Sequence, residues 1–301
     1  MILRCMKNDM VFILNRNSGR VKQKLPQIYR AVDKYINKDV FSVRMAETSS
    51  PEEARKIIAE LENGYNPVVV AVGGDGTVNK TLNHIAGKNI MLGIIPLGSG
   101  NALAREMKIP LHIEKAVQKL NDFRVRSIDL MRVNRQYYGA CVGGIGFDAL
   151  IAQKFENLTE RGLKNYIRLS VQEFFKYKNI EVVLQIGQAE YRHNAFLVSF
   201  ANTSQYGNNA YIAPKAKPDD GMLDIVVMKK LEVHKTPVLA AKLFTKKIDT
   251  YKHLEYYKAD KFSLITTSEK MYMHLDGEPI ELEENRADVE VLPGLLKVVV
   301  G

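Results

Sequence analysis

Three glycines enclose one aspartate directly after a short apolar run, and this stretch is the most chemically suggestive of the chain. The segment reads VVVAVGGDGT over residues 68–77. Glycine lets a backbone approach a ligand closely, and backbone N–H groups that converge at the start of a helix bind anionic phosphate. The same glycines would also suit a strand-to-helix turn that binds nothing, so the loop alone does not decide between these alternatives.

The aspartate favours phosphate chemistry that involves a metal ion. A carboxylate inside a phosphate loop repels the ligand unless a metal or a proton transfer requires it, and Mg²⁺ between phosphate oxygens is the usual solution. A second loop, PLGSGN at 96–101, offers the hydroxyl of Ser99 and the amide of Asn101. These groups can donate to phosphate or receive a metal-bound water. The two loops together predict a phosphate site that uses Mg²⁺.

Two other segments suggest ligand motifs that we do not adopt. Lys80 follows the glycine loop, but it does not follow a glycine, so the GxxxxGK[ST] pattern of P-loop enzymes is absent. Residues 144–149, GIGFDA, fit the GxGxxA pattern of dinucleotide sites. They come after the alternating strands and helices, among antiparallel strand signals, so we do not expect a dinucleotide there.

The first hundred residues alternate between strand and helix patterns. Ser50 and Pro51, with Glu53 three residues after the serine, mark one helix start. Apolar runs separated by helices predict a parallel sheet covered on both faces, and ligands of such sheets bind at loops after the strands. Three Gly/Ser/Asn-rich loops occupy that position: 15–19, 73–77 and 96–101. The predicted strands are 10–15, 41–46, 68–72 and 91–96, and the predicted helices are 25–36, 51–63 and 78–86.

From about residue 130 short strands with turn signals replace this alternation. Gly187-Gln188 has the composition of a hairpin turn. We therefore predict a Rossmann-like α/β domain over 1–130 and a mostly antiparallel β domain over 131–301. The last apolar segment, 295–300, either closes the β domain or returns to the first sheet. The predicted strands are 131–143, 180–187, 189–202, 222–230, 261–267 and 271–284, with helical insertions at 161–178 and 236–256.

Taken in order, these segments resemble the soluble diacylglycerol kinase and sphingosine kinase family over nearly the whole chain. The matching residues are NRNSG, GGDGT, PLGSGNALAR, KPDDG and DGEP. GGDGT is shared with NAD kinases, whereas its combination with the other segments is far more specific. The resemblance implies an NAD-kinase-like α/β nucleotide-binding domain followed by a β-sandwich, with the active site between them.

The resemblance also implies a role for particular residues. Asp75 would join the Mg²⁺ network, and Glu278 would be the general base on the lipid hydroxyl. A structural Mg²⁺ would bind the carboxylate of Asp220 and the carbonyls of Lys217 and Met222. The residues matched to ATP binding are Asn15, Ser18, Gly19, Thr48, Gly73, Gly74, Asp75, Gly76, Thr77, Ser99 and Asn101.

General chemistry agrees with these roles, because phosphoryl transfer needs alignment, charge neutralisation and an acceptor for the hydroxyl proton. Asp276-Gly277 before Glu278 would also suit an ordinary hairpin turn. Three residues depart from the family pattern: Arg16 stands where proline is common, and Lys80 and Ala102 stand where many members have an acidic residue. We interpret these departures as a subfamily difference.

The predicted function is therefore an ATP- and Mg²⁺-dependent lipid kinase that converts diacylglycerol to phosphatidic acid. The alternatives are a kinase of sphingoid bases or other lipids, an NAD kinase, and a relative that binds lipid or nucleotide without catalysis. The acyl acceptor depends on pocket shape, which side chains spread over the β domain would set.

Composition limits the other possibilities. The chain has 301 residues, a net charge of +9 and a pI near 9.3, without the motifs of nucleic-acid-binding proteins. Two distant cysteines, Cys5 and Cys141, support neither a disulfide framework nor a zinc site. No apolar run approaches the roughly 20 residues that cross a bilayer, and the N-terminus lacks the core of a signal peptide. We expect a cytoplasmic protein, and homodimers would be unsurprising.

Two segments bear on contact with the membrane. Residues 164–178 place Tyr166, Ile167, Val171, Phe174 and Phe175 on one helical stripe, which would be core, an acyl pocket or a membrane contact. Residues 242–258 carry five lysines, which would be either a solvated helix face or a face towards anionic lipid at the inner membrane surface.

Overall fold

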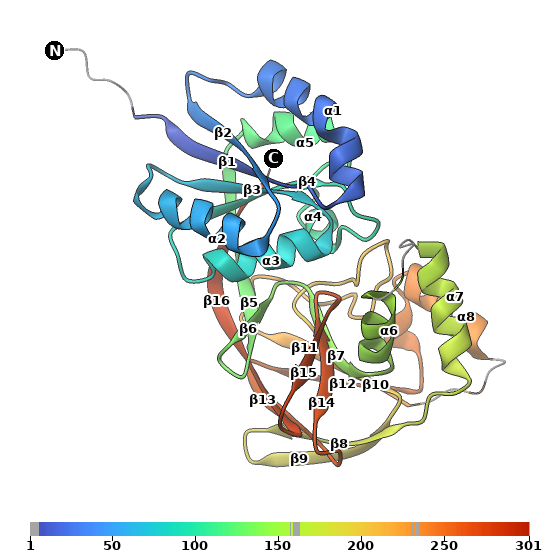
Figure 1. Cartoon of the computed structure of the whole chain (residues 1–301). Coiled ribbons are helices and arrows are strands. Elements are labelled where there is room, and N and C mark those ends of the chain that lie inside the picture. Colours follow the sequence, from blue (N-terminus) through green and yellow to red (C-terminus); the bar gives the residue numbers. More distant parts are fainter. Residues whose placement is uncertain (1–5, 157, 159–162, 230–231, 233–234, 301) are drawn as a thin grey trace. The chain divides into compact units, whose positions relative to one another are not determined.

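The computed structural model describes residues 6–156, 158, 163–229, 232 and 235–300 (Figure 1). The chain divides into two compact units, one formed by residues 1–128 and 294–301 and the other by residues 129–293. Cys5 lies outside the described residues, and Cys141 is a buried free thiol. We describe the α/β unit and the β unit separately.

The α/β unit contains the predicted parallel sheet, with strand order β2-β1-β3-β4. Its strands end together, since Asn15 pairs with Thr48 and Gly73 pairs with Pro96. Near the C-terminus, Val298 runs parallel to β4, so the last apolar segment returns to this sheet. The strands are β1 (Asn8–Asn15), β2 (Phe41–Thr48), β3 (Val68–Gly73), β4 (Met91–Pro96) and the end of β16 (Arg286–Val300).

Helices cover both faces of this sheet, with α1 and α5 on one side and α2 and α3 on the other (Figure 1). Ser50 caps α2 by accepting the N–H of Glu53 at 3.2 Å, as its sequence predicts. Helix α1 begins at Gly19 rather than residue 25, because the serine cap precedes a polar first turn that apolar periodicity does not reveal. The helices are α1 (Gly19–Tyr35), α2 (Pro51–Glu60), α3 (Asp75–Ile85), α4 (Ala102–Glu106) and α5 (Ile113–Leu120), with a 3₁₀ turn at Leu61–Asn63.

The β unit is an antiparallel sandwich. One sheet has the order β12-β11-β10-β7-β14-β15, and the other contains β16-β13-β8-β9, with β5 also beside β16. Apolar side chains from both sheets form one core that includes Leu184, Phe200 and Phe262. The strands are β5 (Arg124–Val133), β6 (Tyr137–Gly139), β7 (Val142–Gly146), β8 (Ile180–Ile186), β9 (Ala189–Ala195), β10 (Leu197–Ala201), β11 (Leu223–Met228), β12 (Leu254–Ala259), β13 (Lys261–Thr266), β14 (Met271–Leu275) and β15 (Glu278–Leu282).

Several predicted strands of this unit are in fact two or three. The segment 131–143 turns at Asn134-Arg135, where both residues have positive φ, and 189–202 is interrupted at Phe196. The segment 271–284 is a hairpin that turns at Asp276-Gly277. The predicted strands are too long because short polar turns interrupt the apolar segments, and apolar patterning does not reveal these turns. The hairpin at Gly187-Gln188 is confirmed, because Ile186 pairs with Ala189.

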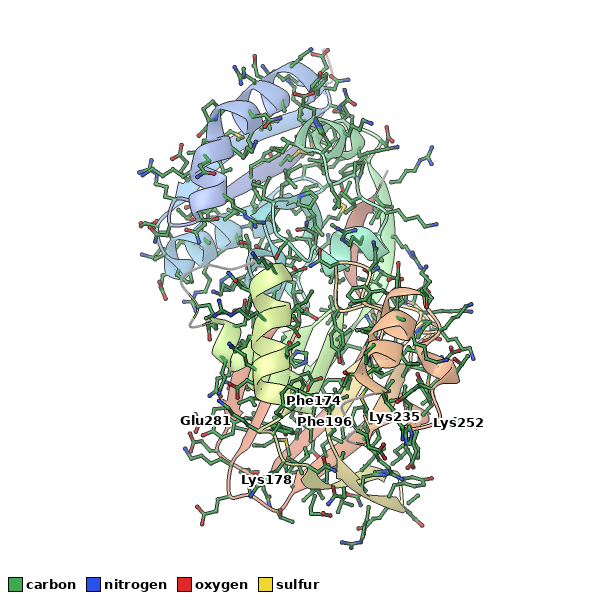
Figure 2. All side chains as sticks on the ribbon, turned by 90° about the vertical axis from the view of Figure 1, so that its right-hand side faces the viewer. Phe174, Lys178, Phe196, Lys235, Lys252 and Glu281 are labelled. Carbon is green, nitrogen blue, oxygen red and sulfur yellow. The ribbon has the colours of Figure 1, made fainter. Side chains whose placement is uncertain are left out.

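The helices of the β unit are α6 (Phe147–Glu156), α7 (Leu163–Phe174) and α8 (Thr236–Phe244), with a 3₁₀ turn at Ile248–Thr250. The predicted insertion at 236–256 ends early, since β12 begins at Leu254; residues 161, 162 and 230 of predicted elements lie outside the described part. Figure 2 shows Phe174 of α7 beside Phe196, and the ring centroids lie 5.3 Å apart. Among the described residues, no helix is long and apolar enough to cross a membrane.

Candidate active site

The loop between β1 and α1 places several predicted nucleotide contacts at the carboxyl end of the parallel sheet. Asn15 ends β1 and lies beside Thr48, the last residue of β2. Ser18 caps α1, because its Oγ accepts the backbone N–H of Val21 at 3.5 Å. A Cβ at Gly19 would have no atom within 4 Å, so the space at the helix start is open. The sequence therefore brings these four predicted residues to one edge.

The glycines of the next two loops are required because the loops touch. A Cβ at Gly98 would lie 2.6 Å from Cα of Gly74, which is a backbone atom and cannot swing away. A Cβ at Gly73 would lie 2.3 Å from Oγ1 of Thr77. These contacts give the glycines a packing role. The phosphate-binding role of the two loops, including Gly76 and Ser99, is a proposal.

The carboxylate of Asp75 joins these two loops. Its Oδ2 accepts the backbone N–H of Asn101 at 2.8 Å, and its Oδ1 accepts the backbone N–H of Ala102 at 2.6 Å. A Cβ at Gly100 would lie 2.6 Å from Oδ2, so glycine is needed for this approach. Ala102 contributes its backbone here, which its side chain does not affect.

Asn101 holds the second loop in shape. Its backbone is left-handed, with φ 51° and ψ 48°, a conformation that asparagine tolerates better than most residues. Its side chain is buried, and it bonds the backbone of Gly98 twice: Oδ1 accepts the N–H at 2.9 Å and Nδ2 donates to the carbonyl at 2.8 Å. The amide thus fixes the loop, while its predicted contact with the nucleotide stays a prediction.

Two arginines that the sequence reasoning gave no role contact the second loop. Arg20 donates from its guanidinium to the carbonyl of Leu97 at 3.1 Å, and Arg105 donates from Nε to the carbonyl of Gly100 at 2.9 Å. Guanidinium groups have five donors, so both can bind an anion as well. Arg20 follows Ser18-Gly19 directly, and this spacing was the available signal. Lys80 lies exposed on α3.

In the β unit, Glu278 follows a tightly held hairpin turn. Asp276 and Gly277 have φ 53° and 84°, as expected for a two-residue hairpin loop. The carboxylate of Asp276 accepts the backbone N–H groups of residues 140, 141 and 142 at 2.8, 2.8 and 3.1 Å. The segment is therefore a hairpin turn, as the alternative interpretation held, and this turn fixes the start of β15, where Glu278 lies.

The loop predicted to hold a structural Mg²⁺ contains an ion pair. Asp220 accepts a bond from Lys258 Nζ at 2.8 Å through Oδ2 and from the N–H of Met222 at 3.2 Å through Oδ1. Asp129 fastens the same loop by accepting the N–H of Gly221 at 2.7 Å. The described residues contain no group of three or more His, Cys, Asp or Glu side chains suited to a metal. Binding of Mg²⁺ by Lys217, Asp220 and Met222 stays a prediction. A metal ion there would compete with the ammonium group of Lys258 for the carboxylate of Asp220.

The GIGFDA segment has structural glycines. A Cβ at Gly144 would lie 2.5 Å from Oδ2 of Asp148, and a Cβ at Gly146 would lie 2.7 Å from the carbonyl oxygen of Phe196. Both glycines belong to β7, which pairs antiparallel with β10 and β14. Close packing therefore accounts for this motif. Asp148 is buried. The sequence shows it only as one residue of the GxGxxA match and gives it no role of its own.

Both units match known family models. Residues 9–133 match the diacylglycerol kinase catalytic domain. Residues 141–300 match the YegS C-terminal NAD kinase beta sandwich-like domain, which is more than half of the chain.

Individual relatives agree with the family models. The diacylglycerol kinase of Bacillus subtilis (strain 168) is 29% identical over 215 residues, which cover 70% of this chain and 71% of that protein. A Yersinia pestis (strain Pestoides F) protein named "Probable lipid kinase YegS-like" is 25% identical over 295 residues, which cover 96% and 95%. The crystal structure of a diacylglycerol kinase from Bacillus anthracis strain Sterne has the same fold, with a TM-score of 0.71, 20% identity and coverage of 98% and 97%.

Proposed function

We propose that diacylglycerol is the acceptor substrate of this chain, which belongs to the family of lipid kinases that combine a diacylglycerol kinase catalytic domain with a YegS-type C-terminal domain. The chain is an ATP-dependent lipid kinase. Diacylglycerol is preferred over a sphingoid base because relatives named diacylglycerol kinase align with most of the chain. The product would be phosphatidic acid.

The observation that carries the phosphoryl-transfer part of this proposal is the clamp between the two phosphate loops. Asp75 bonds two N–H groups of the PLGSGN loop, and Gly74 meets Gly98 at backbone contact distance. The clamp sets the loops rigidly at the start of α3, whose dipole favours an anion. Preorganised donors of this kind suit phosphoryl transfer, which depends on positioning and charge neutralisation.

In this proposal Glu278 accepts the proton of the lipid hydroxyl. It is the first residue of β15, directly after the turn that Asp276 anchors to three backbone N–H groups. A strand residue next to an anchored turn has a well-defined direction, which a general base needs. The role of Mg²⁺ would be to neutralise phosphate charge. In the α/β unit we assign this role to Asp75, whose carboxylate lies where the two phosphate loops meet.

A radiolabelled ATP assay tests the proposal. Diacylglycerol, sphingosine, phosphatidylglycerol and NAD would be offered separately in mixed micelles, and we expect label in phosphatidic acid. Glu278→Gln should lower kcat by about 100-fold or more, within the range that general bases contribute. Glu284→Gln, at an exposed position in the bend after β15, is the matched control and should leave kcat unchanged. Labelling of another acceptor alone, or full activity of Glu278→Gln, would contradict the proposal.

We also propose that the kinase works at an anionic membrane surface. Four residues of the predicted stripe are exposed rather than core: Tyr166, Ile167, Val171 and Phe175. Helix α8 adds exposed Val238 and Phe244, and both helices, α7 and α8, lie on the side of the β unit that faces the viewer in Figure 2. Exposed cations accompany them, and such a mixture suits anionic lipid. These cations are Lys164, Arg168, Lys176, Lys246, Lys247 and Lys252.

Co-sedimentation with vesicles tests the membrane contact. Binding should increase with the fraction of phosphatidylglycerol and fall for Val171→Asp combined with Phe175→Asp, which are 55% and 61% exposed. The control is Tyr65→Asp, at a 45% exposed position of the α/β unit. Binding that ignores lipid charge, or that the double variant retains in full, would refute this contact.

A further inference from the structure

A buried histidine lies two residues before the turn that precedes Glu278. His274 belongs to β14, is 3% exposed, and pairs in register with Pro279 on one side and Gly144 on the other. Neither the ATP loops nor the proposed base includes it. A buried imidazole has two distinct nitrogens that need partners, so its surroundings show what it holds in place.

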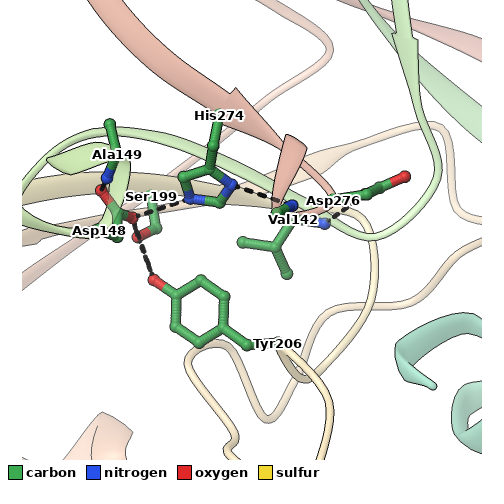
Figure 3. A network of polar contacts seen from close by, with 8 residues as sticks. Val142, Asp148, Ala149, Ser199, Tyr206, His274 and Asp276 are labelled. Atoms are coloured by element: carbon green, nitrogen blue, oxygen red, sulfur yellow. Dashed lines mark hydrogen bonds and ion pairs between the residues drawn. The ribbon is translucent and has the colours of Figure 1, made fainter. Parts of the chain in front are cut away.

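The two nitrogens of His274 face different groups (Figure 3). Nε2 lies 3.3 Å from Oδ2 of Asp148, in an ion-pair contact that is not aligned as a strong hydrogen bond. Nδ1 accepts the backbone N–H of Gly277 at 3.4 Å. The ring therefore stands between a buried carboxylate and the backbone of the turn.

The carboxylate on the other side is firmly fixed. Asp148 Oδ1 accepts the N–H of Ala149 at 2.9 Å, and Oδ2 accepts the hydroxyls of Ser199 at 2.8 Å and Tyr206 at 3.2 Å (Figure 3). Burial and the charge of Asp148 hold the pKa of Tyr206 well above its ordinary value, so this hydroxyl stays protonated and can donate. A fixed acceptor next to Nε2 gives the ring a fixed orientation.

These contacts define the tautomer of His274. The backbone N–H of Gly277 can only donate, so Nδ1 must keep its lone pair. The proton of a neutral imidazole then lies on Nε2, facing the acceptor carboxylate. Asp148 therefore selects the ring form that can receive the Gly277 N–H.

Gly277 lies between the paired residues Leu275 and Glu278, and its Cβ side is open. A Cβ built on this residue would meet no atom within 4 Å, and its φ of 84° is available mainly to glycine. Asp276 anchors the first half of the turn through its carboxylate. The contact with His274 restrains the second half, which leads directly into Glu278.

We propose that His274 is a positioning residue for the phosphoryl transfer, oriented by Asp148 and acting on Glu278 through the backbone of Gly277. The inference rests on the proposed role of Glu278 as base. A loosened turn would let that carboxylate move by a fraction of an ångström to an ångström, and displacements of this size cost up to about 100-fold in rate. Binding of ATP should not change, because His274 acts on the β15 carboxylate only.

Two conservative variants separate the contacts of the ring. In His274→Asn, the amide oxygen can take the place of Nδ1 and keep the Gly277 bond, while the Asp148 contact is lost. In His274→Gln, the longer amide can reach Asp148 in place of Nε2, while the Gly277 bond is lost. We expect kcat to fall by about 10- to 100-fold in His274→Gln and by no more than about 3-fold in His274→Asn, with the KM for ATP unchanged in both.

A second measurement reports the restraint without activity. Exchange of the Gly277 amide hydrogen, followed by NMR, should be faster in His274→Gln than in His274→Asn, at Tm values that differ little. The inference would be overturned if both variants lost the same kcat in proportion to their fall in Tm. It would also be overturned if neither variant changed the exchange rate of the Gly277 amide. If His274→Gln is fully active while Glu278→Gln is inactive, the inference fails and the proposed base stands. If Glu278→Gln is fully active, the proposed base fails and the positioning role fails with it.

Discussion

The two units hold their candidate functional groups at very different distances along the sequence. In the α/β unit, Asp75 bonds to backbone groups 26 and 27 residues away, in the next loop of the same sheet edge. In the β unit, Asp148 bonds to Ser199, 51 residues away, and Asp276 bonds to residue 140, 136 residues away. One site is made of neighbouring loops and the other of distant strands.

This difference explains why only one of the sites has a recognisable local motif. A clamp between consecutive loops needs glycines at fixed spacing, so GGDGT and PLGSGN carry it visibly. A network between distant strands needs only suitable side chains at separate points, and each one alone looks ordinary. We therefore expect substitutions in the α/β unit to affect chemistry and fold together, whereas those in the β unit affect single contacts.

The largest expected effect is that of Asp75→Asn, which tests the clamp directly. An amide keeps one acceptor oxygen and turns a donor towards the second N–H, so one charge-assisted bond of about 1.5–3 kcal/mol is replaced by a repulsion. Activity should fall by about 100-fold or more, because the loops and the phosphate charge balance are disturbed together. Kinase assays and thermal unfolding measure the two effects.

The control for this substitution is Asp39→Asn, at an exposed loop position of the same unit. It should change neither quantity. If Asp75→Asn lowered activity with an unchanged Tm, the carboxylate would act in chemistry alone and the clamp would not matter for folding. The comparison between the units would then lose its main support.

The fold was largely predictable because local patterns and the long-range result agree. The apolar runs at 68–72 and 91–96 are the buried strands β3 and β4, and Ser50 caps α2 as expected. Errors arose where a local signal was weak. Helix α6 was not predicted, and the glycines of GIGFDA, where no dinucleotide was expected, make room for Asp148 and the backbone of Phe196.

The candidate site was predictable only in its residue types. The sequence singles out Asp75 and Asn101 as polar groups of the phosphate loops, but it does not show that both hold the loops by backbone bonds. The ion pair between Asp220 and Lys258 joins residues 38 positions apart. The contact of His274 with Asp148 joins a residue of β14 to a residue of α6. These two positions are far apart in the sequence, and only the topology of the sandwich brings them together.

A smaller loss of stability is expected from Gly98→Ala. This substitution tests whether position 98 needs glycine because the two loops touch there. The new Cβ would lie 2.6 Å from the Cα of Gly74 and 2.8 Å from Oδ1 of Asn101, so the loops must separate. Overpacking of this kind costs about 1–3 kcal/mol, which corresponds to a fall of Tm by about 2–4 °C per kcal/mol.

The matched comparison is Gly19→Ala, where a Cβ meets nothing within 4 Å and the residue is helical. This substitution should raise stability by about 0.5–1 kcal/mol. Equal Tm values for the two variants would mean that the loops yield easily, and that the α/β unit is no more tightly constrained than the β unit.

The smallest expected effect is that of Asp224→Asn, which tests whether a contact in the β unit can be removed alone. Burial raises the pKa of Asp224, although Lys258 at 3.6 Å opposes the shift, and Oδ2 of Asp224 is buried without an aligned partner.

A carboxyl whose pKa is higher in the folded protein stabilises the fold below its unfolded pKa. That contribution is lost as the pH rises through the folded pKa. At pH 7 the charged form of Asp224 therefore weakens the β unit. Asp224→Asn should raise the Tm slightly at pH 7, and this gain should disappear near pH 3. The control is Asp260→Asn, at an exposed position, which should change the Tm at neither pH. A lower Tm at pH 7 would mean that the attraction of Lys258 exceeds the cost of burial, and that the long-range contacts of this unit are as interdependent as the clamp of the other.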